Sequence, residues 1–151
     1  MKVKLDLPYA DKIVRSKGLA ADGSVQQFHT QNVLRRIKRY MPYRSEGHPF
    51  YKITVVQTDI RKPEIVTDTP YAKYLFYGKV MIDPKLGVAG FMTPEGWRSR
   101  KGCVKVLTDR DLVFFRGKNP QAGPRWDRAL SANEGKAMAA DLQNFINRRS
   151  K

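Results

Sequence analysis

The side chains best suited to chemistry are few in this chain. It has two histidines, His29 and His48, and one cysteine, Cys103. Neither histidine has a partner at the spacing of a metal site or of an activated nucleophile, and nothing in the sequence brings Cys103 to a histidine. A single cysteine also excludes an intramolecular disulfide and a multi-cysteine zinc site. We therefore expect an intracellular protein.

Acidic residues and glycines give equally little support to catalysis. Asp59, Glu64, Asp68 and Asp83 could in principle gather Mg²⁺ for a nuclease, but they are scattered through predicted turns, where solvated acids are ordinary. The glycines match neither a P-loop nor a dinucleotide fingerprint, because no GK[ST] or G-x-G-x-x-G occurs. The sequence favours a protein that is not an enzyme and that uses no cofactor or metal.

The charge of the chain indicates a polyanionic partner. Its 151 residues include 29 Lys and Arg against 14 Asp and Glu, a net charge of +15 without a long block of like charge. Nucleic acid, an acidic protein surface and anionic lipid all fit this charge, and simple solubility is the alternative. The length predicts one domain over residues 1–151. No apolar run approaches the ~20 residues that span a bilayer, and the first eight residues lack the core of a secretory signal, so we expect no membrane partner.

The stretch from Thr69 to Gly78, TPYAKYLFYG, places four aromatic rings in ten residues. It predicts a short helix with Thr69 as the cap, Pro70 at the first helical position and Gly78 as a left-handed stop. One face would carry Tyr71, Tyr74, Leu75 and Gly78, while Phe76 and Tyr77 point away from it. A core helix and an assembly surface are both compatible with this pattern.

Periodicity assigns the elements of the first half. Alternation over residues 2–7 predicts a strand, and a short helix could follow over 9–17. A capping-box pattern opens a helix over 24–41 with one apolar and one basic side. Its Arg and Lys residues form either a solvated face or a nucleic-acid contact. Strands over 50–57 and 64–67 would form a hairpin that leads into the aromatic helix.

The second half should contain further strands and the closing helices. We expect a strand at 79–82, then a long loop at 83–102 without regular structure, whose apolar residues either fold back on the core or dock on a neighbouring subunit. Strands over 104–108 and 112–116 would form a second hairpin. Pro124 opens a helix, and a shift of the apolar stripe together with Gly135 predicts a break before a last helix that ends at Arg149.

Three stretches in this order resemble landmarks of the minor capsid proteins of tailed bacteriophages, also called neck or tail-completion proteins. They are MPYRSEG at 41–47, TPYAKYLFYG at 69–78 and GPRW at 123–126. In that family a helix ends in a proline-tyrosine turn with a glycine, a strand leads to a Pro-Tyr-Ala segment with aromatics, and a Gly-x-x-Trp turn opens the closing helix. The likeness covers roughly residues 24–149.

The resemblance implies a small α+β subunit like those of tail-completion and tail-terminator proteins. Its small antiparallel or mixed sheet would pack against a helix of the N-terminal half and against the C-terminal helices. Such subunits form a homo-oligomeric ring, hexameric by the same resemblance, between portal and tail around the passing double-stranded DNA. The expected partners are further copies and the other neck, portal-side and tail proteins. The protein would be assembled in the host cytoplasm and reside in the virion.

Within that interpretation, two groups of residues should make contacts. Ring contacts are expected from Tyr71, Tyr74, Phe76, Tyr77, Phe91, Met92 and Trp97. Contacts to DNA or to an acidic partner ring are expected from Arg35, Lys38, Arg39, Arg98, Arg100 and Lys101. A lumen densely lined with Lys and Arg would hold DNA rather than let it slide, so acidic proteins are an alternative to DNA.

The alternative function is a free-standing nucleic-acid-binding protein, in which the same charge acts with tyrosine and tryptophan rings that stack on bases. A metal-dependent nuclease is the third class, and it predicts cleavage that EDTA abolishes.

Overall fold

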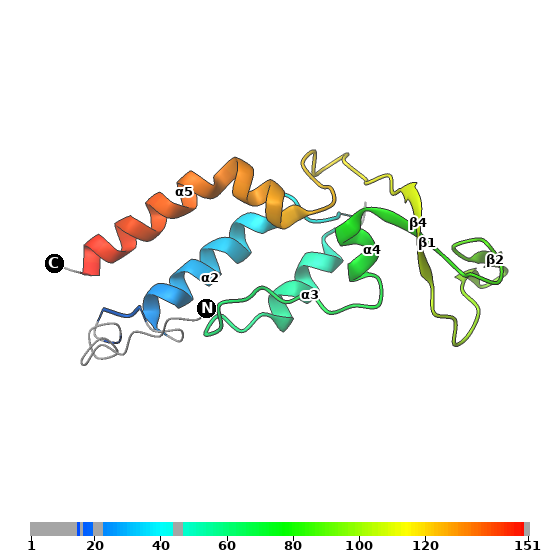
Figure 1. Ribbon diagram of the computed structural model, residues 1–151, viewed down its shortest axis with the longest axis horizontal. Helices are drawn as coiled ribbons and strands as arrows, with labels where there is room; N and C mark the ends of the chain where they lie inside the picture. Colours follow the sequence, from blue (N-terminus) through cyan, green and yellow to red (C-terminus); the bar gives the residue numbers. More distant parts are fainter. Residues whose placement is uncertain (1–14, 16, 20–22, 44–46, 150–151) are drawn as a thin grey trace, which may run out of the picture.

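The computed structural model describes residues 15, 17–19, 23–43 and 47–149. Helices occupy one end of an elongated molecule and two small antiparallel sheets occupy the other (Figure 1). The expected α+β class is confirmed. The strand expected over 2–7 and most of the helix expected over 9–17 lie outside the described residues.

Two long helices run side by side through the helical end. Helix α2 (Ser24–Ile37) confirms the helix expected over 24–41, although it gives way to a turn over 38–40 before Pro42. Helix α5 (Trp126–Arg149) packs along it (Figure 1). The expected break at Gly135 is wrong because the two apolar sets of α5 meet different neighbours. Trp126 contacts the rings of Phe50 and Phe76, whereas Phe145 stacks on Phe28 of α2 at 4.2 Å.

The strand expected over 50–57 is wrong: this segment is helix α3 (Pro49–Gln57). Pro49 starts the helix, and Phe50 and Thr54, one turn apart, are both buried. The Thr54 hydroxyl lies 3.0 Å from the Phe50 carbonyl and 2.6 Å from the Thr67 hydroxyl. Tertiary burial thus overrides the β preference of the sequence. Residues 64–67 are extended but form no strand, so the hairpin expected here is absent from the described residues.

The aromatic stretch forms helix α4 (Ala72–Tyr77). Gly78 adopts the expected left-handed stop, with φ +67°, and its N–H donates to the Leu75 carbonyl. The expected cap is wrong. The helix begins after Tyr71, and the Thr69 hydroxyl has no hydrogen-bond partner among the described residues.

The strands pair differently from the expected hairpins. The strand expected at 79–82 is confirmed as β1 (Lys79–Ile82), and its antiparallel partner is β4 (Val106–Asp111). Residues 112–116 form no strand. The segment expected to be irregular contains a second antiparallel pair, β2 (Phe91–Thr93) and β3 (Gly96–Arg98). The β1–β4 pair lies beside α4 and projects away from α2 and α5, so the expected packing against the long helices is wrong (Figure 1).

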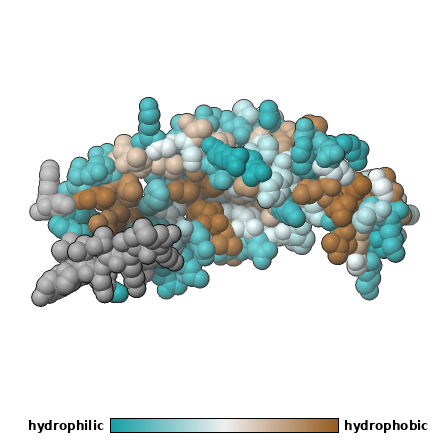
Figure 2. All heavy atoms as spheres, in the orientation of Figure 1, coloured by the Kyte–Doolittle hydropathy of each residue, from teal (hydrophilic) through white to brown (hydrophobic). Residues whose placement is uncertain are grey.

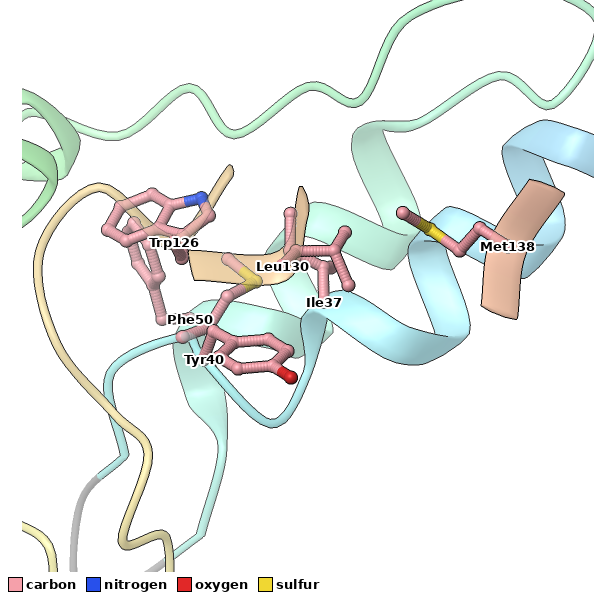
Figure 3. Close-up of a cluster of buried hydrophobic side chains, with 7 residues drawn as sticks. Ile37, Tyr40, Phe50, Trp126, Leu130 and Met138 are labelled. Carbon is pink, nitrogen blue, oxygen red and sulfur yellow. The ribbon is translucent and has the colours of Figure 1, made fainter. Parts of the chain in front are cut away.

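The core lies where α2, α3 and α5 meet. Figure 3 shows Trp126 and Leu130 of α5 directed toward Phe50 of α3 and toward Ile37 and Tyr40 of the α2 end. Ring pairs join this cluster, with centroids 5.5 Å apart for Phe50 and Trp126 and 5.0 Å apart for Phe76 and Trp126. Among the described residues, Met41 and Thr54 are the largest side chains that are fully buried. This core fixes the base from which the strands project.

Candidate assembly surface

Residues 79–116, here called the arm, carry most of the exposed apolar surface. Ten of the fifteen exposed large hydrophobic residues lie in the arm, whereas none of the buried hydrophobic residues does, among the described residues. Figure 2 shows hydrophobic side chains gathered over the strands at that end of the molecule. The ten are Leu86, Val88, Phe91, Met92, Trp97, Val104, Val106, Leu107, Val113 and Phe115.

This exposure follows from the way the strands are built. A two-stranded sheet has too little packed area to bury both of its faces. Helix α4 contacts β1, but within the described residues no helix packs against the β2–β3 pair. Met92 and Trp97, which are paired across that hairpin, are therefore 71% and 57% exposed. Large apolar groups in such a cluster are typical of a surface that another molecule covers.

A groove of about 530 Å³ runs between α4 and the arm. Aromatic side chains dominate its lining, among them Tyr71, Tyr74, Trp97, Phe114 and Phe115. The Tyr74 hydroxyl donates to the Lys105 carbonyl and so fixes α4 to the arm. The groove presents mostly aromatic and aliphatic side chains, which suits an apolar protein segment better than a charged one.

The base of the β2–β3 hairpin is fixed by Asp83, the one buried charged residue in the described part of the arm. Its carboxylate accepts two hydrogen bonds from Arg100, at 2.8 and 3.0 Å, and one from the Lys85 N–H. The Arg100 guanidinium holds the pKa of the Asp83 carboxyl far below its usual value. Burial raises the pKa of the nearby Cys103 thiol, and the Asp83 carboxylate raises it further. The hydrogen bonds of Asp83 hold the base of the β2–β3 hairpin in place. Because its pKa is raised, the Cys103 thiol stays protonated at neutral pH.

The three stretches that carry the phage resemblance meet at the joint between the helices and the arm. The Gly123 N–H donates to the Tyr40 carbonyl beside Met41, and the Arg125 N–H donates to the Phe76 carbonyl. A Cβ on Gly78 would lie 2.7 Å from Pro124, so only glycine fits this approach. The Arg125 guanidinium lies over the Tyr77 ring, 4.4 Å from its centroid. Segments far apart in the sequence thus build one junction.

The seven residues expected in ring contacts fall into three positions. Phe91, Met92 and Trp97 are exposed on the β2–β3 hairpin, and Tyr71 and Tyr74 line the groove. Tyr77 is 41% exposed under Arg125. Phe76 is partly buried and packs against the core cluster. Of the other six, Tyr71, Tyr74 and Trp97 line the same groove.

The six basic residues expected to meet DNA or an acidic partner do not form one surface. Arg35, Lys38 and Arg39 lie on α2 or in the turn that follows it, and Arg98, Arg100 and Lys101 lie in the arm. Most are exposed, but Arg100 is bonded to Asp83 and Arg39 lies 3.4 Å from Glu134. These two arginines therefore have structural partners within the chain.

A second polar cluster, which was not predicted from the sequence, lies between α2 and α5. The carboxylate of Glu134, which lies inside α5, is buried and accepts hydrogen bonds from Arg36 and from the Tyr40 hydroxyl. Arg36 also bonds Asp141 at 2.6 Å. Burial by itself raises the pKa of Glu134, but the hydrogen bonds from Arg36 and Tyr40 outweigh it and lower that pKa. The available signal was the spacing of Glu134 and Asp141, seven residues apart on one face of α5.

Little in the structure supports a reaction site. Within the described ranges, no three His, Cys, Asp or Glu side chains gather closely enough to hold a metal ion. Asp83, one of the four acids considered for Mg²⁺, is bonded to Arg100. None of the helices in the described part combines the length and apolar character that crossing a bilayer requires.

Comparison with protein-family models, with curated proteins and with solved structures gives no match.

Proposed function

We propose that this protein is a structural subunit of the neck of a tailed bacteriophage, in a ring between the capsid portal and the tail. The observation that carries the proposal is the apolar arm, which projects from a well-packed set of helices with its large side chains exposed. An enzyme needs a pocket with placed polar groups, whereas this surface offers apolar contact area. Such surfaces are typical of subunits that another protein covers.

The junction supports the same proposal. The stretches at 41–47, 69–78 and 123–126 resemble phage neck proteins, and their described parts meet at the base of the arm. A rigid base lets each subunit hold its arm in one direction. Repeated head-to-tail contacts in a fixed direction close into a ring.

In this proposal, the positive charge acts toward acidic neighbours and toward the passing DNA. Arg35 and Lys38 are exposed on α2 and at its C-terminal end, outside the arm. Basic groups on separate surfaces allow one to meet a partner ring while the other faces the DNA. Spread in this way, the charge would not grip DNA as tightly as one continuous basic stripe.

The test is a photo-reactive amino acid placed at Met92 in phage particles. We expect it to cross-link to another copy or to a neighbouring neck protein, because Met92 projects from the arm. Val56 is the matched control, since it is 86% exposed on α3, outside the arm. Imaging of the head–tail joint would then place the protein in the particle.

Two results would contradict the proposal. One is a protein absent from purified particles. The other is a monomer that binds free DNA with an affinity that falls steeply as salt rises, which is the behaviour of a dedicated nucleic-acid-binding protein.

A further inference from the structure

Residues 112–116, LVFFR, follow β4 without regular structure and are here called the overhang. Its exposure alternates as in a strand: Leu112 and Phe114 are half-buried, whereas Val113 is 98% and Phe115 45% exposed. β-branched and aromatic residues in this pattern are strong strand formers. The sequence therefore favours a paired strand at a position where the fold leaves it unpaired.

The reason is that both strands of the pair end together, since Lys79 at the start of β1 pairs with Asp111 at the end of β4. The Leu112 N–H still donates to the Gly78 carbonyl, at 2.8 Å. Immediately before Gly78 the same chain forms helix α4, which offers no strand edge with which the overhang could pair. Among the described residues, the backbone groups of Val113, Phe114 and Phe115 make no hydrogen bond. An extended backbone with free N–H and C=O groups is a template for the addition of another strand.

We propose that the added strand is the overhang of a second copy, paired antiparallel about a two-fold axis at Phe114. In this register, Val113 of each copy faces Phe115 of the other, so the two exposed apolar residues cover each other twice. Pairs of an aromatic and a β-branched residue stabilise antiparallel strands. Such self-complementarity is what a two-fold contact requires.

Neighbouring registers fit less well. An axis at Val113 would place Arg110 opposite Arg116 of the other copy, which sets like charges against each other. An axis at Phe115 would place Val113 opposite Gly117, which has no side chain to cover it. The register at Phe114 avoids both problems.

The charge of the arm sets the salt dependence of this pairing. Residues 79–116 contain eight Lys and Arg against four Asp and Glu. Two copies therefore repel each other, and added salt screens that repulsion and strengthens the pair. Binding to DNA has the opposite dependence on salt. The contact does not rest on the proposed phage function, since a two-fold pair can form whether or not a ring is built.

The first test is sedimentation equilibrium of the full chain at low and high salt. We expect a monomer–dimer equilibrium that salt shifts toward the dimer. Val113→Lys should weaken the dimer roughly tenfold or more, because both apolar pairs are lost. Val56→Lys, an equally exposed valine outside the arm, should leave it unchanged. Circular dichroism checks that each variant is folded.

The register is tested by charge exchange. In Val113→Lys/Phe115→Glu, each new lysine faces a new glutamate of the other copy, so association should recover to within a few-fold of the wild type. Phe115→Glu alone should not associate as well. Non-specific apolar association would not recover in the double variant.

Disulfide cross-linking tests the same register independently. In a Cys103→Ser background, Val113→Cys and Phe115→Cys proteins should form a disulfide faster when mixed than either does alone. A chain that stays monomeric at all salt concentrations, a Val113→Lys protein that associates like Val56→Lys, or equal cross-linking in all three samples would overturn the proposal.

Discussion

The helical body and the arm differ in how far they bury their large apolar side chains. In the body, comprising α2, α3, α4 and α5, apolar rings pack on one another and a buried acid has partners on a second helix or directly after it. In the arm, one buried acid fixes the base of a hairpin, but the large apolar groups remain exposed. The body can thus be stable alone, whereas the arm has unused contact area. The difference indicates which part folds the chain and which part meets other molecules.

The largest effect is expected where the body is most tightly packed. Trp126→Ala removes a buried ring that contacts both Phe50 and Phe76. We expect a loss of about 3–5 kcal/mol in the free energy of unfolding, the usual range for buried aromatic truncations. Urea unfolding followed by circular dichroism measures it. A loss below about 1 kcal/mol would mean that the body is not the stable part.

The next effect concerns the buried acid of the body. Glu134→Gln leaves Arg36 and Tyr40 without their charged acceptor, and it should cost roughly 2–3 kcal/mol of unfolding free energy, since Arg36 keeps Asp141. Urea unfolding at neutral pH measures this loss. Unchanged stability would show that the network contributes nothing.

The same carboxylate predicts how stability depends on pH. The pKa of Glu134 is lower in the folded than in the unfolded chain, so its contribution is complete above the unfolded pKa and is lost as pH falls through the folded pKa. We expect wild-type stability to fall below about pH 5. Glu134→Gln should fall less steeply in urea unfolding repeated at descending pH. Identical slopes would exclude Glu134 as a source of the acid sensitivity.

A smaller effect, of opposite sign, tests the continuity of α5. Gly135 lies inside the helix, and a Cβ there would meet nothing within 4 Å. Gly135→Ala should therefore raise the unfolding free energy by about 0.5–1 kcal/mol. A thermal melt detects the change. If the helix were broken at this glycine, as the sequence pattern indicated, alanine would bring no gain.

Local signals in the sequence predicted part of this architecture. The capped periodic pattern of α2, the strand β1 and the left-handed stop at Gly78 were all recognisable, because each depends on neighbouring residues. Helix α3 was not, since its β-branched residues favour a strand, whereas the burial of Phe50 and Thr54 depends on contacts with distant segments. Strands β1 and β4 are separated in the sequence by the whole segment that contains β2 and β3, so their pairing leaves no short-range signal.

The candidate surface was predicted in the same partial way. The exposure of Phe91, Met92 and Trp97 was one of two outcomes that the sequence left open, because large apolar residues among glycines and prolines could also have folded back on the core. The packing of Phe76 against the core and the ion pair of Asp83 with Arg100 could not be predicted, because both depend on partners that are distant in the sequence.

The most direct measurement compares two double variants in stability and in particle assembly. Phe91→Ser/Met92→Ser removes exposed apolar groups from the arm, and Val55→Ser/Val56→Ser removes groups of similar exposure from the body. We expect both proteins to melt within a few degrees of the wild type, because exposed side chains contribute little to folding. Only the arm variant should fail to support assembly of phage particles. Normal assembly with the arm variant, or equal failure of both, would contradict the account.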